Sequence, residues 1–180
     1  MTKITGQISI IIQAPAHDVY EYVLDFTRHP EWVANLSKVT KQSNGPIGVG
    51  SLFRASEGPP PLSLGQKAKM MFFFMVGMAA MGVKPFSESR ITALEPDRRI
   101  VWQAWLPRRE GNYNQAEWEI TFEPQNGSTR LTQRFGYQPQ LWAARQMVGP
   151  AEDIEQACAV NLANLKAVLE EKQRWPASSR

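Results

Sequence analysis

The chain has few of the residues that form cross-links or metal sites. It has one cysteine, Cys158, among 180 residues, so an internal disulfide is impossible and a reducing compartment, the cytoplasm, is expected. Its two histidines, His17 and His29, lack a cysteine or another histidine at metal-ligand spacing, so we predict no metal and no cofactor. His29 precedes Pro30, and we expect it to be a surface or turn residue rather than a catalytic one.

Sequence motifs of several enzyme classes are also missing. The chain has no Gly-x-Ser-x-Gly elbow, no phosphate loop and no dinucleotide fingerprint. The remaining candidate polar groups are Arg54, Glu88, Arg90, Tyr113 and Arg134. Strand alternation directs most of them outward, away from a cavity, so the sequence identifies no catalytic residue. The net charge of +3 suits an anionic membrane surface, but no basic stripe or recognition helix indicates a nucleic-acid partner.

What the chain does contain is a long helical pattern near its C-terminus, over residues 150–173. Pro150 suits a first helical position, and acidic residues in the first turn suit the helix dipole. Apolar residues then recur at the spacing of one buried stripe, which Asn161 interrupts: Ile154, Ala157, Cys158, Leu162, Leu165, Val168 and Leu169. We therefore predict one long helix that needs a large apolar surface to cover it.

Strand patterns in the rest of the chain supply that surface. Alternating residues and turn residues predict strands at 4–14, 37–41, 48–56, 87–94, 99–106, 113–122 and 128–137, with short helices at 15–24 and 31–36. Short turns such as 95–97 and the Asn126-Gly127 pair favour antiparallel hairpins. The order predicts an α+β fold, with the long helix packed on one face of a curved antiparallel sheet.

Several segments resemble one known superfamily. They are residues 14–20 (APAHDVY), 25–26 (DF), 30–32 (PEW), 45–46 (GP), 48–50 (GVG), 95–102 (EPDRRIVW), 127–132 (GSTRLT) and 161–166 (NLANLK). Together they resemble the polyketide cyclase/dehydrase-like branch of the START-like (SRPBCC) superfamily, over nearly the whole chain except about 58–84. The resemblance implies a helix-grip fold, in which the sheet wraps the helix around an internal apolar cavity. We expect one domain over residues 1–175, with an apolar insertion at about 58–84 and a tail at 176–180.

The implied cavity defines the candidate ligand-binding site. We expect inward strand positions and the long helix to line it, with Trp32, Leu36 and Met147 nearer its mouth: Trp32, Leu36, Phe53, Trp102, Trp118, Gln133, Phe135, Met147 and Asn161. The aromatic residues could equally fill a closed core. Gln133 and Asn161 carry more information because a buried amide needs partners, although backbone groups or water could supply them.

The insertion holds the longest apolar run, residues 70–83, which is shorter than the about 20 residues that a spanning helix needs. It could form a lid, a homodimer contact or a membrane-surface contact with flanking lysines at the headgroups, or it could be a pair of buried strands. Candidate membrane or dimer contacts are Met70, Phe72, Phe73, Phe74, Met75, Met78 and Met81.

Two functions therefore remain open. The first is binding or transport of a hydrophobic, lipid-like or polyketide-like molecule, without catalysis. The second is a polyketide-type cyclase or dehydratase, which the resemblance alone implies.

Overall fold

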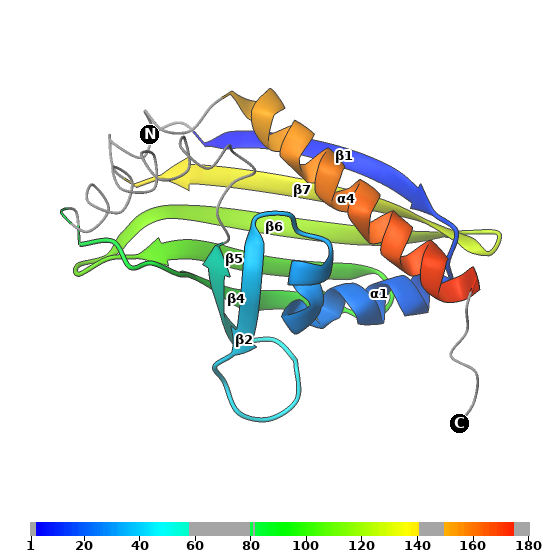
Figure 1. Cartoon of the computed structure of the whole chain (residues 1–180), viewed down its shortest axis with the longest axis horizontal. Coiled ribbons are helices and arrows are strands. Elements are labelled where there is room, and N and C mark those ends of the chain that lie inside the picture. Colours follow the sequence, from blue (N-terminus) through cyan, green and yellow to red (C-terminus); the bar gives the residue numbers. More distant parts are fainter. Residues whose placement is uncertain (1–2, 58–79, 81, 141–149, 175–180) are drawn as a thin grey trace.

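A seven-stranded antiparallel sheet forms the body of the molecule (Figure 1). The computed structural model describes residues 3–57, 80, 82–140 and 150–174. In the sheet the strands lie in the order β1-β7-β6-β5-β4-β3-β2, and every neighbouring pair is antiparallel. Their bounds are β1 Ile4–Ile12, β2 Leu36–Lys41, β3 Leu52–Glu57, β4 Ser87–Glu95, β5 Arg99–Pro107, β6 Asn112–Gln125 and β7 Ser128–Pro139. Sequential hairpins join β4 to β7, as the turn residues predict.

Two helical segments follow β1, and one long helix ends the described chain. They are α1 Ala16–Leu24, the 3-10 helix η1 Phe26–Glu31, and α4 Ala151–Arg174. The long helix packs against β1 and η1 and runs diagonally across one face of the sheet (Figure 1). We call this face, which carries Ile8, Ile10 and Ile12, the inner face. The predicted α+β helix-grip architecture is confirmed.

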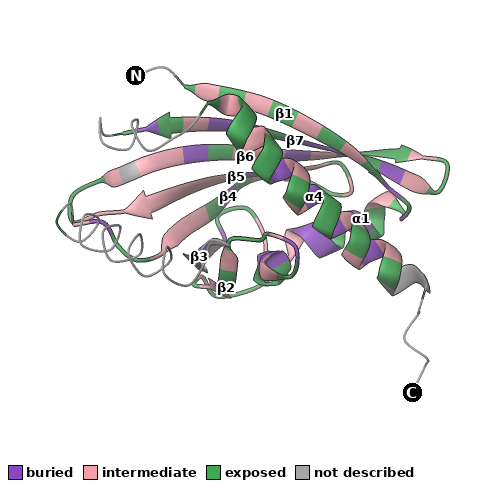
Figure 2. Cartoon of the chain, turned by 45° about the horizontal axis from the view of Figure 1, so that its top comes forward, coloured by how far each residue is buried: buried purple, intermediate pink, exposed green. Residues whose placement is uncertain are grey.

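The hydrophobic core lies where α1, the C-terminal half of α4 and the sheet meet. Val19 and Val23 of α1 and Leu165 of α4 have no exposed surface. They pack with inner-face residues of the sheet, including Leu131 and Ile120. Buried and exposed positions alternate along the strands (Figure 2), because successive strand side chains point to opposite faces.

Two sequence predictions about local structure are wrong. Residues 31–36 form no helix; instead η1 lies earlier, because the Asp25 carboxylate caps the Thr27 N–H and the chain turns to bury Phe26. Residues 48–51 form a turn rather than the start of β3. The Ser51 N–H donates to the Gly48 carbonyl, and the Gly48 N–H donates to Ser51 Oγ. Gly50 has φ +88, and Val49 is 65% exposed.

Polar side chains of α4 also cover the free edge of the sheet at β1. The Gln7 N–H donates to Glu155 Oε1 at 3.1 Å, and Lys166 Nζ donates to the Ile11 carbonyl at 2.7 Å. Just beyond the strand, the Gln13 N–H donates to Glu170 Oε1 at 2.9 Å. An edge strand otherwise offers its backbone groups to other chains, so α4 both packs on the sheet and protects its edge.

Candidate ligand-binding site

A continuous row of aromatic rings lines the inner face from β7 to η1. We define this aromatic row as Phe135, Trp118, Trp102, His29 and Trp32. Ring centroids are 5.8 Å apart for Phe135 and Trp118, 6.3 Å for Trp118 and Trp102, 6.3 Å for Trp102 and His29, and 4.9 Å for His29 and Trp32. Strand register creates the first half of the row, because Trp102 pairs with Trp118 and Trp118 pairs with Phe135.

Phe26 joins this row to strand β3, which lies beyond β4 in the sheet. Its ring stacks on His29 at 4.3 Å and on Phe53 at 4.8 Å, and it meets Trp102 edge-on at 5.3 Å. The structure therefore brings together five residues that the sequence predicts as ligand contacts, Trp32, Phe53, Trp102, Trp118 and Phe135, in one aromatic cluster. The sequence interpretation overlooked Phe26 and His29 as members of it. Their i, i+3 spacing could have indicated a shared face, because such residues eclipse in a 3-10 helix.

The inner face is tightly packed at one end and more open at the other. Near α1, Ile12, Ile100 and Phe122 are at most 3% exposed. Towards the opposite end, inner-face positions on β5, β6 and β7 are only half-buried: Ala104, Leu106, Asn114, Trp118 and Tyr137. The aromatic row lies at the boundary between the two ends, with Trp118 half-buried.

Gln133 places a carboxamide beside this boundary. It lies on β7 two positions from Phe135 on the same face, and it pairs across the strands with Ile8 and Ile120. The residue is 6% exposed, and its Oε1 has no hydrogen-bond partner among the described residues. A buried, unpaired amide oxygen costs about 1–3 kcal/mol relative to a paired one, so this position favours a molecule that supplies the missing bond.

Trp32 ends the row with a second unpaired polar atom. The residue is 2% exposed, which is deeper than a place near a cavity mouth would give, and within the described part of the chain its Nε1 has no partner. Two bonds attach this region to α4. Asn164 Nδ2 donates to the Trp32 carbonyl at 3.2 Å, and the Ala34 N–H donates to Asn161 Oδ1 at 3.0 Å. The Asn161 oxygen therefore accepts a bond from the backbone, which is one of the partners that the sequence analysis considered for a buried amide.

His29 is buried, so the prediction of a surface histidine is wrong, although it does lie in a turn of 3-10 helix. It is 6% exposed, and its Nε2 lies 2.9 Å from the Val23 carbonyl. Because a carbonyl only accepts, Nε2 carries the proton and Nδ1 is left as an acceptor. Burial lowers the pKa of His29 to about 4, so the ring is neutral at physiological pH and packs as an aromatic group.

The remaining predicted contacts have different outcomes. Leu36 is half-buried and packs against the core. Met147 and the candidate membrane or dimer contacts at residues 70–81 lie outside the described residues. The end of the insertion is described: Val83 is buried and pairs with Arg108, and the Lys84 N–H donates to the Pro107 carbonyl at 2.8 Å. The end of the predicted insertion therefore lies against the β5–β6 hairpin.

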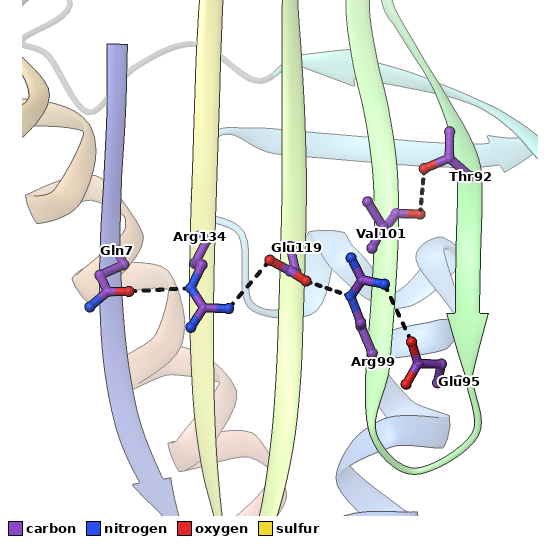
Figure 3. Close-up of polar contacts among 7 residues, drawn as sticks. All are labelled: Gln7, Thr92, Glu95, Arg99, Val101, Glu119 and Arg134. Carbon is purple, nitrogen blue, oxygen red and sulfur yellow. Dashed lines mark hydrogen bonds and ion pairs between the residues drawn. The ribbon is translucent and has the colours of Figure 1, made fainter. Parts of the chain in front are cut away.

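Charged groups on the outer face mostly pair with each other. Arg134 contacts both Gln7 and Glu119, and Glu119 also pairs with Arg99, which reaches Glu95 (Figure 3). Arg54 pairs with Glu88 at 3.0 Å, and Arg90 lies over the Trp105 ring at 5.9 Å. These contacts agree with the predicted outward direction of the strand charges.

A hollow of about 490 Å³ lies by the β1 end of the sheet. Its lining comes mainly from β1, β6 and β7: Lys3, Thr5, Gly6, Gln7, Glu117, Glu119, Arg134, Phe135, Gly136 and Glu155. The five charged residues of this lining already have partners: Lys3 pairs with Glu117, Arg134 pairs with Glu119, and Glu155 accepts the Gln7 N–H. In the part of the chain that the structure describes, no cluster of three or more His, Cys, Asp or Glu residues could hold a metal. No helix in that part is long and apolar enough to cross a membrane.

Comparisons with solved structures identify the same architecture in several proteins. The Zhui aromatase/cyclase from Streptomyces sp. R1128 has a TM-score of 0.68 and 12% identity, covering 99% of this chain and 100% of that chain. Ara h 8.0201 has a TM-score of 0.61 and 9% identity, covering 94% and 99%. Protein CV1439 from Chromobacterium violaceum has a TM-score of 0.62 and 19% identity, covering 92% and 96%. At these identities the likeness shows a shared fold.

Sequence comparison is more specific. A search of curated proteins finds no match to the chain. The family model described as "Polyketide cyclase / dehydrase and lipid transport" matches residues 1–170, which include every described strand and most of α4. On that match, and on the helix-grip sheet that accompanies it, the chain belongs to the polyketide cyclase/dehydrase and lipid transport family.

Proposed function

We propose that this protein binds a hydrophobic small molecule between the inner face of its sheet and α4, and carries that molecule without converting it. The observation that supports this most is Gln133, whose carboxamide oxygen is buried and unpaired within the described residues. Few polar groups set into an apolar, aromatic wall are typical of small-molecule sites. Membership of a family that includes lipid transport agrees with this function.

Occupancy can be tested directly by native mass spectrometry of freshly purified protein, followed by solvent extraction. We expect a discrete excess mass that extraction removes. Replacing Trp118, which is half-buried in the aromatic row, should reduce that excess; Trp118→Ala is the test variant. Trp105→Ala is the matched control, because Trp105 lies next to Arg90 on the outer face. A bare protein mass in all three samples would contradict a carrier function.

The alternative function is a cyclase or dehydratase acting on a ligand in the same place. It would need a proton donor or acceptor beside the ligand. His29 is the histidine of the aromatic row, but its pKa of about 4 makes it a weak base, and its Nε2 proton is held by Val23. Incubating the extracted compound with the protein and searching for a product would separate the two functions, because a carrier returns the compound unchanged.

Loading at a membrane surface and formation of a homodimer remain separate proposals that rest on the apolar run at residues 70–83. Flotation with anionic liposomes tests the first, and mass as a function of concentration tests the second. Protein that stays out of the lipid fraction, or that stays monomeric at all concentrations, would contradict the corresponding proposal.

A further inference from the structure

We propose that a basic tip, formed by the β5–β6 hairpin and the segment that precedes β4, docks the protein on a bilayer with anionic lipid headgroups. The basic tip consists of residues 82–84 and 107–111, and its cations are Lys84, Arg108 and Arg109. This inference rests on the proposed loading at a membrane surface. It names the described residues that make the contact and the lipid charge that they select.

Backbone contacts hold the two segments of the basic tip together. The Arg109 N–H donates to the Gly82 carbonyl at 2.9 Å, and Val83 pairs with Arg108 as an isolated antiparallel bridge. The segments lie close enough that a Cβ on Gly82 would be 3.3 Å from the Cβ of Arg109. Val83 is 6% exposed and anchors this contact. Lys84 and the two arginines are far apart in the sequence, but they are held at one place on the molecule.

The basic tip carries more positive charge than its own carboxylates can balance. Lys84 and Arg109 are exposed, and neither pairs with a carboxylate of the described residues. Arg108 is half-buried, and its Nε is buried with no hydrogen-bond partner in the part of the chain that the structure describes. One carboxylate, Glu110, lies in the same turn, so an excess of positive charge remains there for an anionic surface.

The sequence beside the basic tip favours a bilayer as the source of that negative charge. Lys84 directly follows the apolar run at residues 70–83. Apolar residues next to cations are typical of segments that bind at a bilayer surface, where the cations meet anionic headgroups. An acidic protein would complement the cations alone, whereas a bilayer complements the cations and the apolar run together.

The position of the basic tip agrees with ligand loading from a membrane. The β5–β6 hairpin lies at the end of the sheet away from α1 (Figure 1). At this end the inner face is more open, since Leu106 and Asn114 are only half-buried. Docking through the basic tip would therefore bring the open end of the inner face to the lipid, and would leave the tightly packed end furthest from it.

Flotation of the full chain with two kinds of vesicle tests this inference. One kind consists of phosphatidylcholine alone, and the other of phosphatidylcholine mixed with phosphatidylserine. We expect wild type to partition more strongly to the vesicles that contain phosphatidylserine. High salt should remove the difference between the two kinds, because it screens the attraction between exposed charges.

Neutralising the two exposed cations should weaken the partition to anionic vesicles. The test variant combines Lys84→Gln with Arg109→Gln, and we expect a loss of about fivefold for each cation, or roughly 25-fold for the pair. Exchanging the cations, as Lys84→Arg with Arg109→Lys, keeps the charge and should keep the partition.

A matched control removes the same charge from the opposite end of the sheet. It combines Arg98→Gln with Arg130→Gln, because both residues are exposed and lie near the β4–β5 and β6–β7 turns. Those turns lie about 30 Å from the basic tip, which is several Debye lengths at physiological ionic strength. The control should therefore partition as wild type does.

A measurement on wild type covers the event that the test variant does not fold. Amide hydrogen exchange along residues 107–112 should become slower with the anionic vesicles and should not change with phosphatidylcholine alone. Exchange that is the same with and without the anionic vesicles would overturn the docking role of the basic tip.

The possible failures can be distinguished. Equal partition to both kinds of vesicle, unchanged in the test variant, would overturn this inference and leave loading at a membrane surface standing. No partition to either kind would overturn both, while the excess mass of the purified protein tests the carrier function separately. Retention on immobilised polyglutamate that the test variant loses, without flotation, would overturn the membrane contact and assign the basic tip to an acidic protein.

Discussion

Gly6 lies directly opposite Phe135, and the phenyl ring occupies the space that a side chain at position 6 would need. A Cβ placed on Gly6 would lie 2.6 Å from Phe135 Cζ and 2.5 Å from Glu155 Oε1. Both neighbouring side chains are held in place by other contacts. Phe135 packs against Trp118 in the aromatic row, and Glu155 accepts the Gln7 N–H. The missing side chain therefore lets β1, β7 and α4 approach one another.

Gly6→Ala should accordingly destabilise the protein and displace the Phe135 ring. Overpacking of this kind costs about 1–3 kcal/mol in free energy of unfolding. Urea unfolding checks the stability, and the near-ultraviolet circular dichroism of the aromatic row checks the ring. Gly48→Ala is the control, because a Cβ there meets nothing within 4 Å. Equal stability of the two variants would contradict the close packing at Gly6.

Stability should fall between pH 6.5 and pH 4 because of His29. Its pKa is about 4 in the folded chain, lowered by burial, against an ordinary value of 6.5. In this range the unfolded chain binds the proton and the folded chain does not, so the free energy of unfolding decreases as pH falls. The shift corresponds to at most about 3 kcal/mol over the range.

Urea unfolding at several pH values measures this slope, and His29→Phe should remove most of it. The Phe variant also loses the bond to the Val23 carbonyl, so its stability at pH 7 is expected to be lower. An unchanged slope in that variant would show that other groups are responsible.

Glu119 should stabilise the outer face of the sheet, since it pairs with both Arg99 and Arg134 (Figure 3). Desolvation acts to raise the pKa of Glu119, but its bonds to the two arginines outweigh this, so its pKa lies below the ordinary 4.5. Its stabilisation is present above pH 4.5 and is lost as pH falls through the lowered pKa.

Glu119→Gln should cost roughly 0.5–1 kcal/mol at pH 7, because both arginine partners are more than one third exposed and are screened by solvent. The cost should shrink in high salt. Glu123→Gln on the same strand is the control, because Glu123 is exposed. A loss that persists unchanged in high salt would argue against an electrostatic cause.

Asn161 should hold the segment after η1 against α4. Its Oδ1 accepts the Ala34 N–H at 3.0 Å, so Asn161→Ala leaves that amide to solvent and should cost about 1 kcal/mol. Amide hydrogen exchange at Ala34 should become faster in the variant. Gln156→Ala, at an exposed position on the same helix, is the comparison. Unchanged exchange at Ala34 would mean that the bond contributes little in solution.

The sequence predicts the sheet well where local and tertiary preferences agree. Asn126 and Gly127 adopt φ +43 and +87, the left-handed pair that a tight hairpin needs, so β6 and β7 begin and end near their predicted positions. Regular alternation along β5, β6 and β7 identifies Trp102, Trp118, Gln133 and Phe135 as inner-face residues.

The candidate site was harder to predict where burial depends on distant contacts. Pro30 obscures the environment of His29, because proline indicates a turn, and turns are usually exposed; here Phe26 and two tryptophans cover the imidazole. Likewise, no local pattern shows that Asn161 reaches the Ala34 backbone or that the Trp32 indole N–H has no partner among the described residues, since both depend on how α4 crosses the sheet.

The hydrogen bonds between α4 and the β1 edge would link ligand exchange, under the carrier function that we propose, to the risk of self-association. Glu155, Lys166 and Glu170 all belong to the helix that covers the inner face. A movement of α4 away from the sheet that is large enough to release a bound molecule also uncovers hydrogen-bonding groups along β1. Such groups recruit strands from neighbouring molecules. Under the carrier function that we propose, unloading at high protein concentration would therefore favour polymerisation, and a tightly held ligand would keep the protein monodisperse.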